Sequence, residues 1–231
     1  MALACQAQVW PDESLGPESS TLESEGRVNG LPALLIEGGA QRGQNLFHSF
    51  LEFNVDLQQR VYFANPAAVS NIFTRITGSH PSEIWGTLGV DGEADLYLLN
   101  PNGFLFGATA TLDIAGSLMV STGEDLPFAD GFRYPATPTQ TSDVLTMSVP
   151  LGLQTGLPIQ GTIRNVAQIA FNPEQSLTFL GHRVEHFGSL ASPGGTLQLL
   201  GDTVTVGETA TLDVSAPNGG GEHPDWRGVS G

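Results

Sequence analysis

The chain has 231 residues, of which 40% are hydrophobic and only 14% charged, so it is too apolar for a disordered chain. No run approaches the roughly 20 apolar residues of a spanning helix, which excludes insertion in a membrane by a helix. The 24 acidic residues outnumber eight basic ones, all of them arginine, and the net charge of −16 argues against nucleic-acid binding and against anionic lipid surfaces. Abundant glycine (29) and proline (15) favour many short strands joined by tight turns.

The N-terminus contains part of a leader-like pattern. Residues 4–8 (ACQAQ) resemble the small-residue end of a signal peptide with cleavage after Ala7, but no positive region precedes them. We therefore expect residues 1–9 to be the remnant of a leader or a disordered start. Cys5 is the single cysteine, so an intrachain disulfide and a thiolate zinc cluster are excluded, and the residues before it fit a lipid-acceptor motif poorly.

After a polar, turn-rich segment, the pattern of apolar residues changes at Leu34. Short apolar or alternating runs recur from there, each closed by Gly, Asn-Pro or Asp, and none keeps helical spacing for three turns. Prolines and polar residues interrupt this pattern near residues 121–145, which predicts a long excursion or hairpin on the side of the main structure. Strand texture then resumes and continues to about residue 215. Residues 216–231 are turn-rich and are expected to lead into further repeats that are missing here.

Weak internal self-similarity accompanies these strands. The stretch Ala110–Ile114 (ATLDI) recurs as Ala210–Val214 (ATLDV), and Gly-Ser-Leu or Gly-Thr-Leu triplets recur as well. Repeated short strands that end in Gly or Asn suit a β-solenoid, in which stacked coils bury a core that one coil cannot bury alone. A β-sandwich has the same strand spacing, and the texture alone leaves both architectures open.

Three segments in chain order carry a more specific resemblance. Residues 36–55, 61–88 and 92–122 resemble the filamentous-haemagglutinin N-terminal domain family, also called the two-partner-secretion domain, in its cyanobacterial form. Asn100-Pro101-Asn102-Gly103 is similar to the family's NPNG hallmark. The other signature, NPNL, has no clean counterpart, because Asn65-Pro66-Ala67-Ala68 shares only its first two residues. Asn65 and Pro66 are therefore weaker candidates for a functional site.

The resemblance implies an all-β fold: a right-handed parallel β-helix over residues 10–215, with an N-terminal cap and flanking extra-helical strands or hairpins. It also implies that the periplasmic modules of an outer-membrane transporter recognise the domain. The domain would then direct secretion of a large exported adhesin and template the folding of its β-helix. The expected location is secreted or cell-surface after transient residence in the periplasm. Contacts with host or cell-surface glycans are expected from the missing downstream region.

The residue types of the Asn100–Gly103 motif also predict a local structure. Proline fixes φ, asparagine bonds back to the main chain, and glycine adopts conformations closed to other residues, which together make a tight turn. The motif is therefore expected at a corner of the β-helix. Direct contact of Asn100 or Asn102 with the transporter is the other role that it could have.

Other patterns suggest chemistry that their context disfavours. His182, Glu185 and His186 spell H-x-x-E-H, but on a strand the two imidazoles lie about 13 Å apart, too far for one zinc ion. The acidic stretch Asp91–Asp95 lacks a full calcium ligand set and is expected to be a solvated turn. His48 is expected to be a packed or capping residue.

We therefore expect no catalytic residue, no metal site and no cofactor. The alternatives are a β-helical carbohydrate-active enzyme, either a polysaccharide lyase or a glycosidase, and a directly adhesive β-solenoid module. A lyase typically needs a basic proton abstractor, and the chain has no lysine and only scattered arginine. Fold analogy alone does not establish any of these functions.

Overall fold

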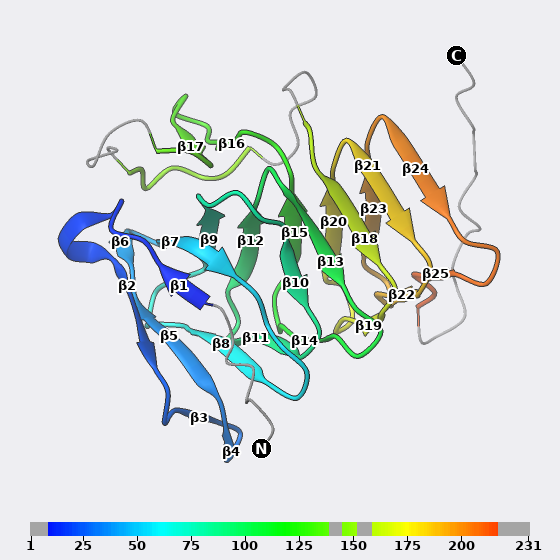
Figure 1. Cartoon of the computed structure of the whole chain (residues 1–231), viewed down its shortest axis with the longest axis horizontal. Coiled ribbons are helices and arrows are strands. Elements are labelled where there is room, and N and C mark those ends of the chain that lie inside the picture. The colour runs from blue at the N-terminus through cyan, green and yellow to red at the C-terminus, as the bar shows by residue number, and fades with distance from the viewer. Residues whose placement is uncertain (1–8, 139–144, 152–158, 217–231) are drawn as a thin grey trace.

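The computed structural model describes residues 9–138, 145–151 and 159–216 (Figure 1). These residues form almost only β-strands, and their single helical element is the short 3-10 turn η1 (Gly16–Glu18). None of the described segments is a helix of the length and apolarity that a membrane crossing requires. Residues 1–8 of the expected leader remnant, including Cys5, and nearly all of the expected start of further repeats lie outside the described residues, whereas Val9 is buried and begins strand β1 (Val9–Pro11).

Three parallel sheets run along the molecule and together form a solenoid whose coils follow one another from left to right in Figure 1. Sheet 1 contains, in order, β7 (Asn45–Phe53), β9 (Asn71–Ile76), β12 (Asp95–Leu99), β15 (Leu118–Ser121), β20 (Ser176–Leu180) and β23 (Thr196–Leu200). Sheet 2 contains β10 (Ser82–Ile84), β13 (Gly103–Phe106), β18 (Thr162–Asn165), β21 (Arg183–His186) and β24 (Thr203–Val206). Sheet 3 contains β5 (Leu34–Gly38), β8 (Arg60–Ala64), β11 (Thr87–Asp91) and β14 (Thr111–Asp113). β19 (Gln168–Ala170), β22 (Ser189–Ala191) and β25 (Thr211–Asp213) form a separate three-stranded sheet, which lies next to β14 and is treated as the continuation of sheet 3. The parallel pairing confirms the β-solenoid and removes the β-sandwich, whose neighbouring strands run antiparallel.

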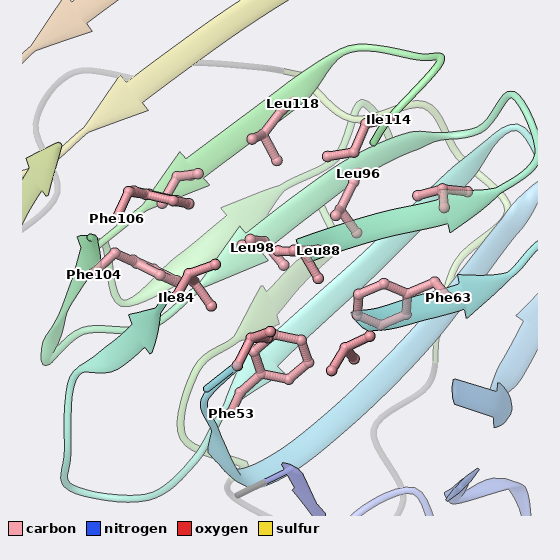
Figure 2. Packing of buried hydrophobic residues seen from close by; sticks show 14 of the residues in the cluster. Phe53, Phe63, Ile84, Leu88, Leu96, Leu98, Phe104, Phe106, Ile114 and Leu118 are labelled. Atoms are coloured by element: carbon pink, nitrogen blue, oxygen red, sulfur yellow. The ribbon is translucent and has the colours of Figure 1, made fainter. Parts of the chain in front are cut away.

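Alternation along each strand turns every second side chain into the solenoid, where stacked coils bury it. In sheet 1, Ile72 pairs with Leu96 and Leu96 with Leu118, so apolar residues about one coil apart lie directly on one another. All three are almost completely buried, and Figure 2 shows the side chains of the three sheets meeting in one core. Burying such a side chain stabilises the fold by about 1.5–3 kcal/mol before ordering costs.

The repeated sequences occupy equivalent corners. β14 and β25 both begin after a turn in which the alanine N–H, of Ala110 or Ala210, donates to the carbonyl of Gly107 or Gly207, at 3.0 Å in each case. Both strands then lie in sheet 3. The recurrence of ATLD therefore marks the same position in two coils, as the stacking of a solenoid requires.

Antiparallel strands close the N-terminal end of the solenoid. β1 (Val9–Pro11) and β6 (Ala40–Arg42) pair with the outer edge of β7, and β2 (Ser20–Glu23) pairs with the outer edge of β5. A small hairpin of β3 (Arg27–Val28) and β4 (Leu31–Pro32) extends from the same end. These strands cover two edges that would otherwise invite pairing with another chain, and they confirm the expected cap.

The chain leaves the solenoid after β15 and rejoins it at β18. The described part of this excursion (residues 122–138, 145–151 and 159–161) contains an antiparallel hairpin of β16 (Asp125–Pro127) and β17 (Arg133–Pro135), which lies above the first coils in Figure 1. The expected flanking hairpin is therefore confirmed. The excursion extends past residue 145, because Phe128 forms an antiparallel bridge with Pro150, and apolar residues at 145–151 belong to it and not to a coil.

A second hydrophobic cluster fixes the excursion to the outer face of sheet 1. Phe47 and Phe73 point away from the solenoid and stack at 5.1 Å between ring centroids, and Phe128 of the excursion packs edge-on against Phe73 at 5.0 Å. Tyr134 packs edge-on against Phe47 at 5.0 Å. Sheet 1 is thus buried on both faces over its first coils.

Candidate functional site

The Asn100–Gly103 motif forms the corner between β12 of sheet 1 and β13 of sheet 2. The N–H of Gly103 donates to the carbonyl of Asn100 at 3.1 Å, which closes a tight turn, and the N–H of Asn100 donates to Ser121 of the next coil at 3.0 Å. The Asn100 carboxamide oxygen accepts from the N–H of Asn102 at 3.0 Å. The corner is therefore held both within the turn and against the coil that follows it.

The side chain of Asn100 also ties the corner to the coil before it. Its Nδ2 donates to the carbonyl of His80 at 3.1 Å and to Oγ of Ser82 at 3.0 Å, and the residue is fully buried. The Nδ2 of Asn102 donates to the carbonyl of Gly78 at 2.9 Å. Both asparagines thus join consecutive coils, which is a structural use of these side chains.

Glycine is required at the end of the motif. Gly103 has a φ of 116°, and a Cβ there would lie 2.5 Å from the carbonyl oxygen of Thr162 in the next coil. The adjoining Gly161 has the same relation to Pro101, since its Cβ would lie 2.5 Å from the Pro101 carbonyl oxygen. The coils approach one another so closely here that neither position has room for a side chain.

Only part of the motif reaches the surface. Asn100 and Gly103 are buried, Pro101 is half-buried and Asn102 is exposed. A cavity of about 390 Å³ lies beside the corner, where the excursion leaves and rejoins the solenoid; it is lined by Pro101, Thr122, Glu124, Asp125, Pro135 and Gln160. In the folded domain Pro101 and Asn102 are accessible from outside, whereas the Asn100 side chain is not.

The weaker candidates, Asn65 and Pro66, form a different corner between β8 of sheet 3 and β9 of sheet 1. The Asn65 Nδ2 donates to the carbonyl of Val69 at 3.0 Å, and its Oδ1 accepts from the N–H of Ala94 in the next coil at 3.1 Å. Asn65 therefore links two coils as Asn100 does. The structure does not bring the two Asn-Pro corners together, because they join different pairs of sheets.

The two histidines of the H-x-x-E-H stretch have separate surroundings. His186 is buried inside the solenoid, with its Nδ1 3.1 Å from the Asn165 amide and its Nε2 3.0 Å from the Thr211 carbonyl. Burial lowers the pKa of His186, against a smaller opposing effect of the Thr211 carbonyl. His182 is half-exposed and pairs with Asp202 at 2.9 Å. Both ring nitrogens of His186 are already bonded, so the pair does not converge on a common ion.

The Asp91–Asp95 stretch forms the corner between β11 and β12. Asp91 and Glu93 are exposed, and the Asp95 carboxylate accepts a 2.7 Å hydrogen bond from the N–H of Ser117. Over the described part of the chain, no three His, Cys, Asp or Glu side chains are grouped as metal ligands would be. The stretch is an acidic turn with one carboxylate directed to the next coil.

His48 lies inside the first coil. It is fully buried against Phe63, 5.3 Å away between ring centroids, and its Nδ1 lies 2.9 Å from Oγ of Ser20 in the cap. Burial lowers its pKa to about 3, so the ring is neutral at ordinary pH. It is a packed residue, in keeping with the sequence-based expectation.

Sequence reasoning missed Arg75, a fully buried residue that links three parts of the chain. Its guanidinium donates to Ser49 of β7 at 2.9 Å, to Ser14 of the N-terminal segment at 3.0 Å and to the carbonyl of Pro135 at 2.9 Å, and it lies over the Tyr134 ring at 4.6 Å. The signal was available, because an arginine within the apolar run NIFTRITG is unusual. Its partners could not be inferred, since Ser14 and Pro135 are each about 60 residues away.

Asp12 completes this buried network. Burial acts to raise the pKa of Asp12, but hydrogen bonds from Ser14, Thr77 and Ser49 outweigh it, and the pKa is lowered overall. The Asp12 oxygens lie 2.6 Å from Thr77 Oγ1 and 2.9 Å from Ser49 Oγ. The negative charge of Asp12 is thus held close to Arg75 through shared hydroxyl groups.

Comparison with known proteins places this architecture in a family. The family model for the TPS secretion domain matches residues 7–222. Over 74 residues the chain is 35% identical to the heme/hemopexin-binding protein of Haemophilus influenzae; this stretch is 32% of the chain and 8% of that relative. The match therefore spans a small part of that relative's length.

A solved structure is similar to the chain as well. The crystal structure of the filamentous hemagglutinin secretion domain aligns over 91% of this chain and 100% of that one, with a TM-score of 0.46 and 16% identity. The fold described above follows from the strand pairing of the chain itself. TPS secretion domains are not enzymes; they direct export across the outer membrane. Because the family model covers nearly the whole chain, this chain belongs to the TPS secretion domain family and is a secretion-directing domain.

Proposed function

We propose that the periplasmic modules of a cognate outer-membrane transporter recognise this chain during a transient stay in the periplasm. The chain then passes outward at the head of a larger exoprotein and ends at the cell surface or outside the cell. The observation that carries this proposal is the family match over residues 7–222. We assign the folded secretion unit to residues 10–215, and contact with host or cell-surface glycans to residues downstream of it.

The Asn100–Gly103 corner is the proposed recognition element, with Asn65 and Pro66 as a secondary one. In the folded chain the transporter would meet Pro101 and Asn102, which reach the surface. Before folding, all four residues of the motif are accessible, and the Asn100 amide is not yet bonded to His80 and Ser82. The motif thus offers different atoms before and after folding.

A templating role has support from the C-terminal end of the solenoid. β23, β24 and β25 are the last strands of their sheets, and over the described residues no strand pairs with their outer edges. Leu197 and Leu199 of β23 and Leu212 of β25 are only partly buried. Further coils added to this end would pair those edges and bury those leucines, so folding would proceed one coil at a time.

The test is an export assay with the parent exoprotein and its transporter in the same cell. Asn102→Ala and Pro101→Ala are the recognition variants, because they alter surface atoms of the corner. Pro173→Ala is the matched control, since Asn172-Pro173 is an exposed Asn-Pro pair at another turn. We expect the two recognition variants to accumulate in the periplasm and the control to be exported normally.

Two outcomes would count against the proposal. Equal export of Pro101→Ala, Asn102→Ala and Pro173→Ala would remove the recognition role of the corner. Undiminished export of a parent protein that lacks residues 36–122 would remove the secretion role of the domain. Nothing in the described residues favours a lyase or a glycosidase, and we propose no catalytic function.

A further inference from the structure

The outer face of sheet 1 changes its chemistry along the solenoid. One register row runs from Phe47 through Phe73, Tyr97 and Met119 to Thr178 and Gln198. The excursion packs on the aromatic beginning of this row, where Phe128 and Tyr134 meet Phe47 and Phe73. The later, polar part of the row forms a separate surface that the second hydrophobic cluster leaves partly open.

A groove of about 450 Å³ lies in that later part, across β12, β15, β20 and β23. Large side chains at Tyr97 and Gln198 stand at its two ends, and the smaller Ser176 and Thr178 lie between them with Met119. The groove arises from this sequence of side-chain sizes, because strands in a parallel sheet are evenly spaced at about 4.8 Å.

Several polar groups in the groove have bonding capacity left over. The Asp95 carboxylate accepts one hydrogen bond, from Ser117, and the Tyr97 hydroxyl has no hydrogen-bond partner among the described residues. Gln198 uses its carbonyl oxygen for Thr178 at 3.2 Å, and its amide is left to donate. Burial raises the pKa of Asp95, and that of Tyr97 to about 12, so both groups are partly withdrawn from water.

The chemistry of the lining restricts the ligand. None of the described residues that line the groove is basic, and with a net charge of −16 the chain repels phosphate, sulfate and other anionic groups. A carboxylate, a phenol, hydroxyls and an amide offer both donors and acceptors beside the apolar Met119. A ligand with hydroxyl groups on its rim and C–H groups on its ring faces matches this mixture.

We propose that this groove binds a neutral oligosaccharide, with Asp95, Tyr97 and Gln198 hydrogen-bonding to its hydroxyl groups. Asp95 supplies the strongest of these bonds, because a charged acceptor bonds about twice as strongly as a neutral one. Such a site would give the secretion domain a glycan contact of its own, in addition to any made by downstream residues. It does not depend on the transporter, so its test is independent of the export assay.

The experiment titrates the purified 231-residue chain with cellohexaose, maltohexaose and chitohexaose, followed by NMR and calorimetry. A polygalacturonate hexamer serves as the anionic comparator and spermidine as the cationic one. We expect a neutral hexamer to bind with a Kd of about 1 mM and the anionic hexamer to bind at least about tenfold more weakly.

Three variants locate the site. We expect Asp95→Asn to weaken binding about tenfold, and Gln198→Ala and Tyr97→Phe about three- to fivefold each. Gln168→Ala, an exposed glutamine of β19 in sheet 3, is the matched control and should bind as the unmodified chain does. Asp95→Asn keeps an oxygen for the Ser117 N–H, and Tyr97→Phe keeps the ring stack on Phe73 at 4.6 Å, so both should fold.

Failure of all three neutral hexamers to bind at about 10 mM would overturn the proposal. Binding that is unchanged in Asp95→Asn and Gln198→Ala would also overturn it, because the sugar would then lie elsewhere. Binding of spermidine without binding of any neutral hexamer would identify a cation site and overturn it as well.

Discussion

Gly103 determines how closely two coils approach at the Asn100–Gly103 corner. Its φ of 116° and the 2.5 Å gap from a would-be Cβ to the Thr162 oxygen act at the same position. At Gly131, in the turn of the excursion hairpin, φ is 87° but no atom lies within 4 Å of such a Cβ. Substitution of Gly131 therefore tests the free-energy cost of a left-handed backbone alone, whereas substitution of Gly103 adds the cost of a steric contact between coils.

We expect Gly103→Ala to lower the free energy of unfolding by about 3–5 kcal/mol, since it adds a backbone clash to a strained φ. Gly131→Ala should cost only about 1–2 kcal/mol, the price of the backbone conformation alone. Urea unfolding followed by circular dichroism measures both. Equal losses in the two variants would show that the contact with Thr162 relaxes freely.

His48 makes the stability of the first coil dependent on pH. Its pKa of about 3 in the folded chain lies below the ordinary value of 6.5, so the unfolded chain binds the proton more readily. The folded state therefore loses stability as the pH falls from about 6.5 towards 3, by about 1.4 kcal/mol for each pH unit once the unfolded histidine is protonated. Above pH 6.5 this histidine has no such effect.

We expect His48→Gln to flatten the fall in unfolding free energy between about pH 6 and pH 4 by close to one proton. His80→Gln is the control, because His80 is exposed and contacts Glu52 at the surface. Denaturant unfolding at several pH values gives both slopes. A His48→Gln slope identical to that of the unmodified chain would assign the acid sensitivity to other groups, of which His186 is the first to examine.

At the scale of elements, the excursion packs on the first coils and is hydrogen-bonded to them. Asn45 of β7 donates to the carbonyls of Thr146 and Ser148 at 3.2 and 2.7 Å, and the Tyr134 hydroxyl donates to the carbonyl of His48 at 2.8 Å. Phe128 fills the centre of the second hydrophobic cluster and is fully buried. The excursion thus covers the aromatic part of sheet 1 and holds it through backbone carbonyls.

Phe128→Ala should lower the free energy of unfolding by about 3–5 kcal/mol, because it empties a buried aromatic position. Met147→Ala is the matched control: Met147 belongs to the same excursion but is 73% exposed, and its loss should change stability by no more than about 0.5 kcal/mol. Thermal and urea unfolding measure the two. A small effect of Phe128→Ala would mean that the cluster adds little to the stability of the coils.

At the scale of the whole molecule, contacts over long sequence separations complete the earliest coils. Asn45 bonds to Ser148 across 103 residues, and Arg75 to Pro135 across 60. The coils up to β13 therefore cannot reach their final packing until the excursion has been made available. A chain that emerges from its N-terminus would show its aromatic face, Phe47 and Phe73, until residues near 150 have followed.

A chain ending at residue 122 should bind a hydrophobic dye and be cut readily by protease in β7 and β9, because the outer face of sheet 1 is uncovered. A chain ending at residue 213 should bind little dye and resist cleavage there. Limited proteolysis with mass spectrometry compares the two. Equal protection of β7 and β9 in both chains would show that the first coils fold without the excursion.

The sequence by itself determined the class of fold and the family. Alternating apolar runs, the Asn-Pro corners and the ordered match through Asn100–Gly103 depend on near neighbours in the chain. The recurrence of ATLD correctly indicated equivalent positions in two coils, since each stacked coil contains the same kind of turn followed by a strand.

Only the tertiary structure decided which strands pair and which polar side chains are buried. Strand spacing along the sequence is the same in a sandwich and a solenoid. Pairing between residues one coil apart cannot be recognised from the residues next to them in the sequence. The same holds for Asn100, whose burial depends on Ser82 and on the coil beyond, and for Arg75, whose partners come from the cap and the excursion. Local periodicity encodes which face of a strand is apolar, but what covers that face depends on the path of the whole chain.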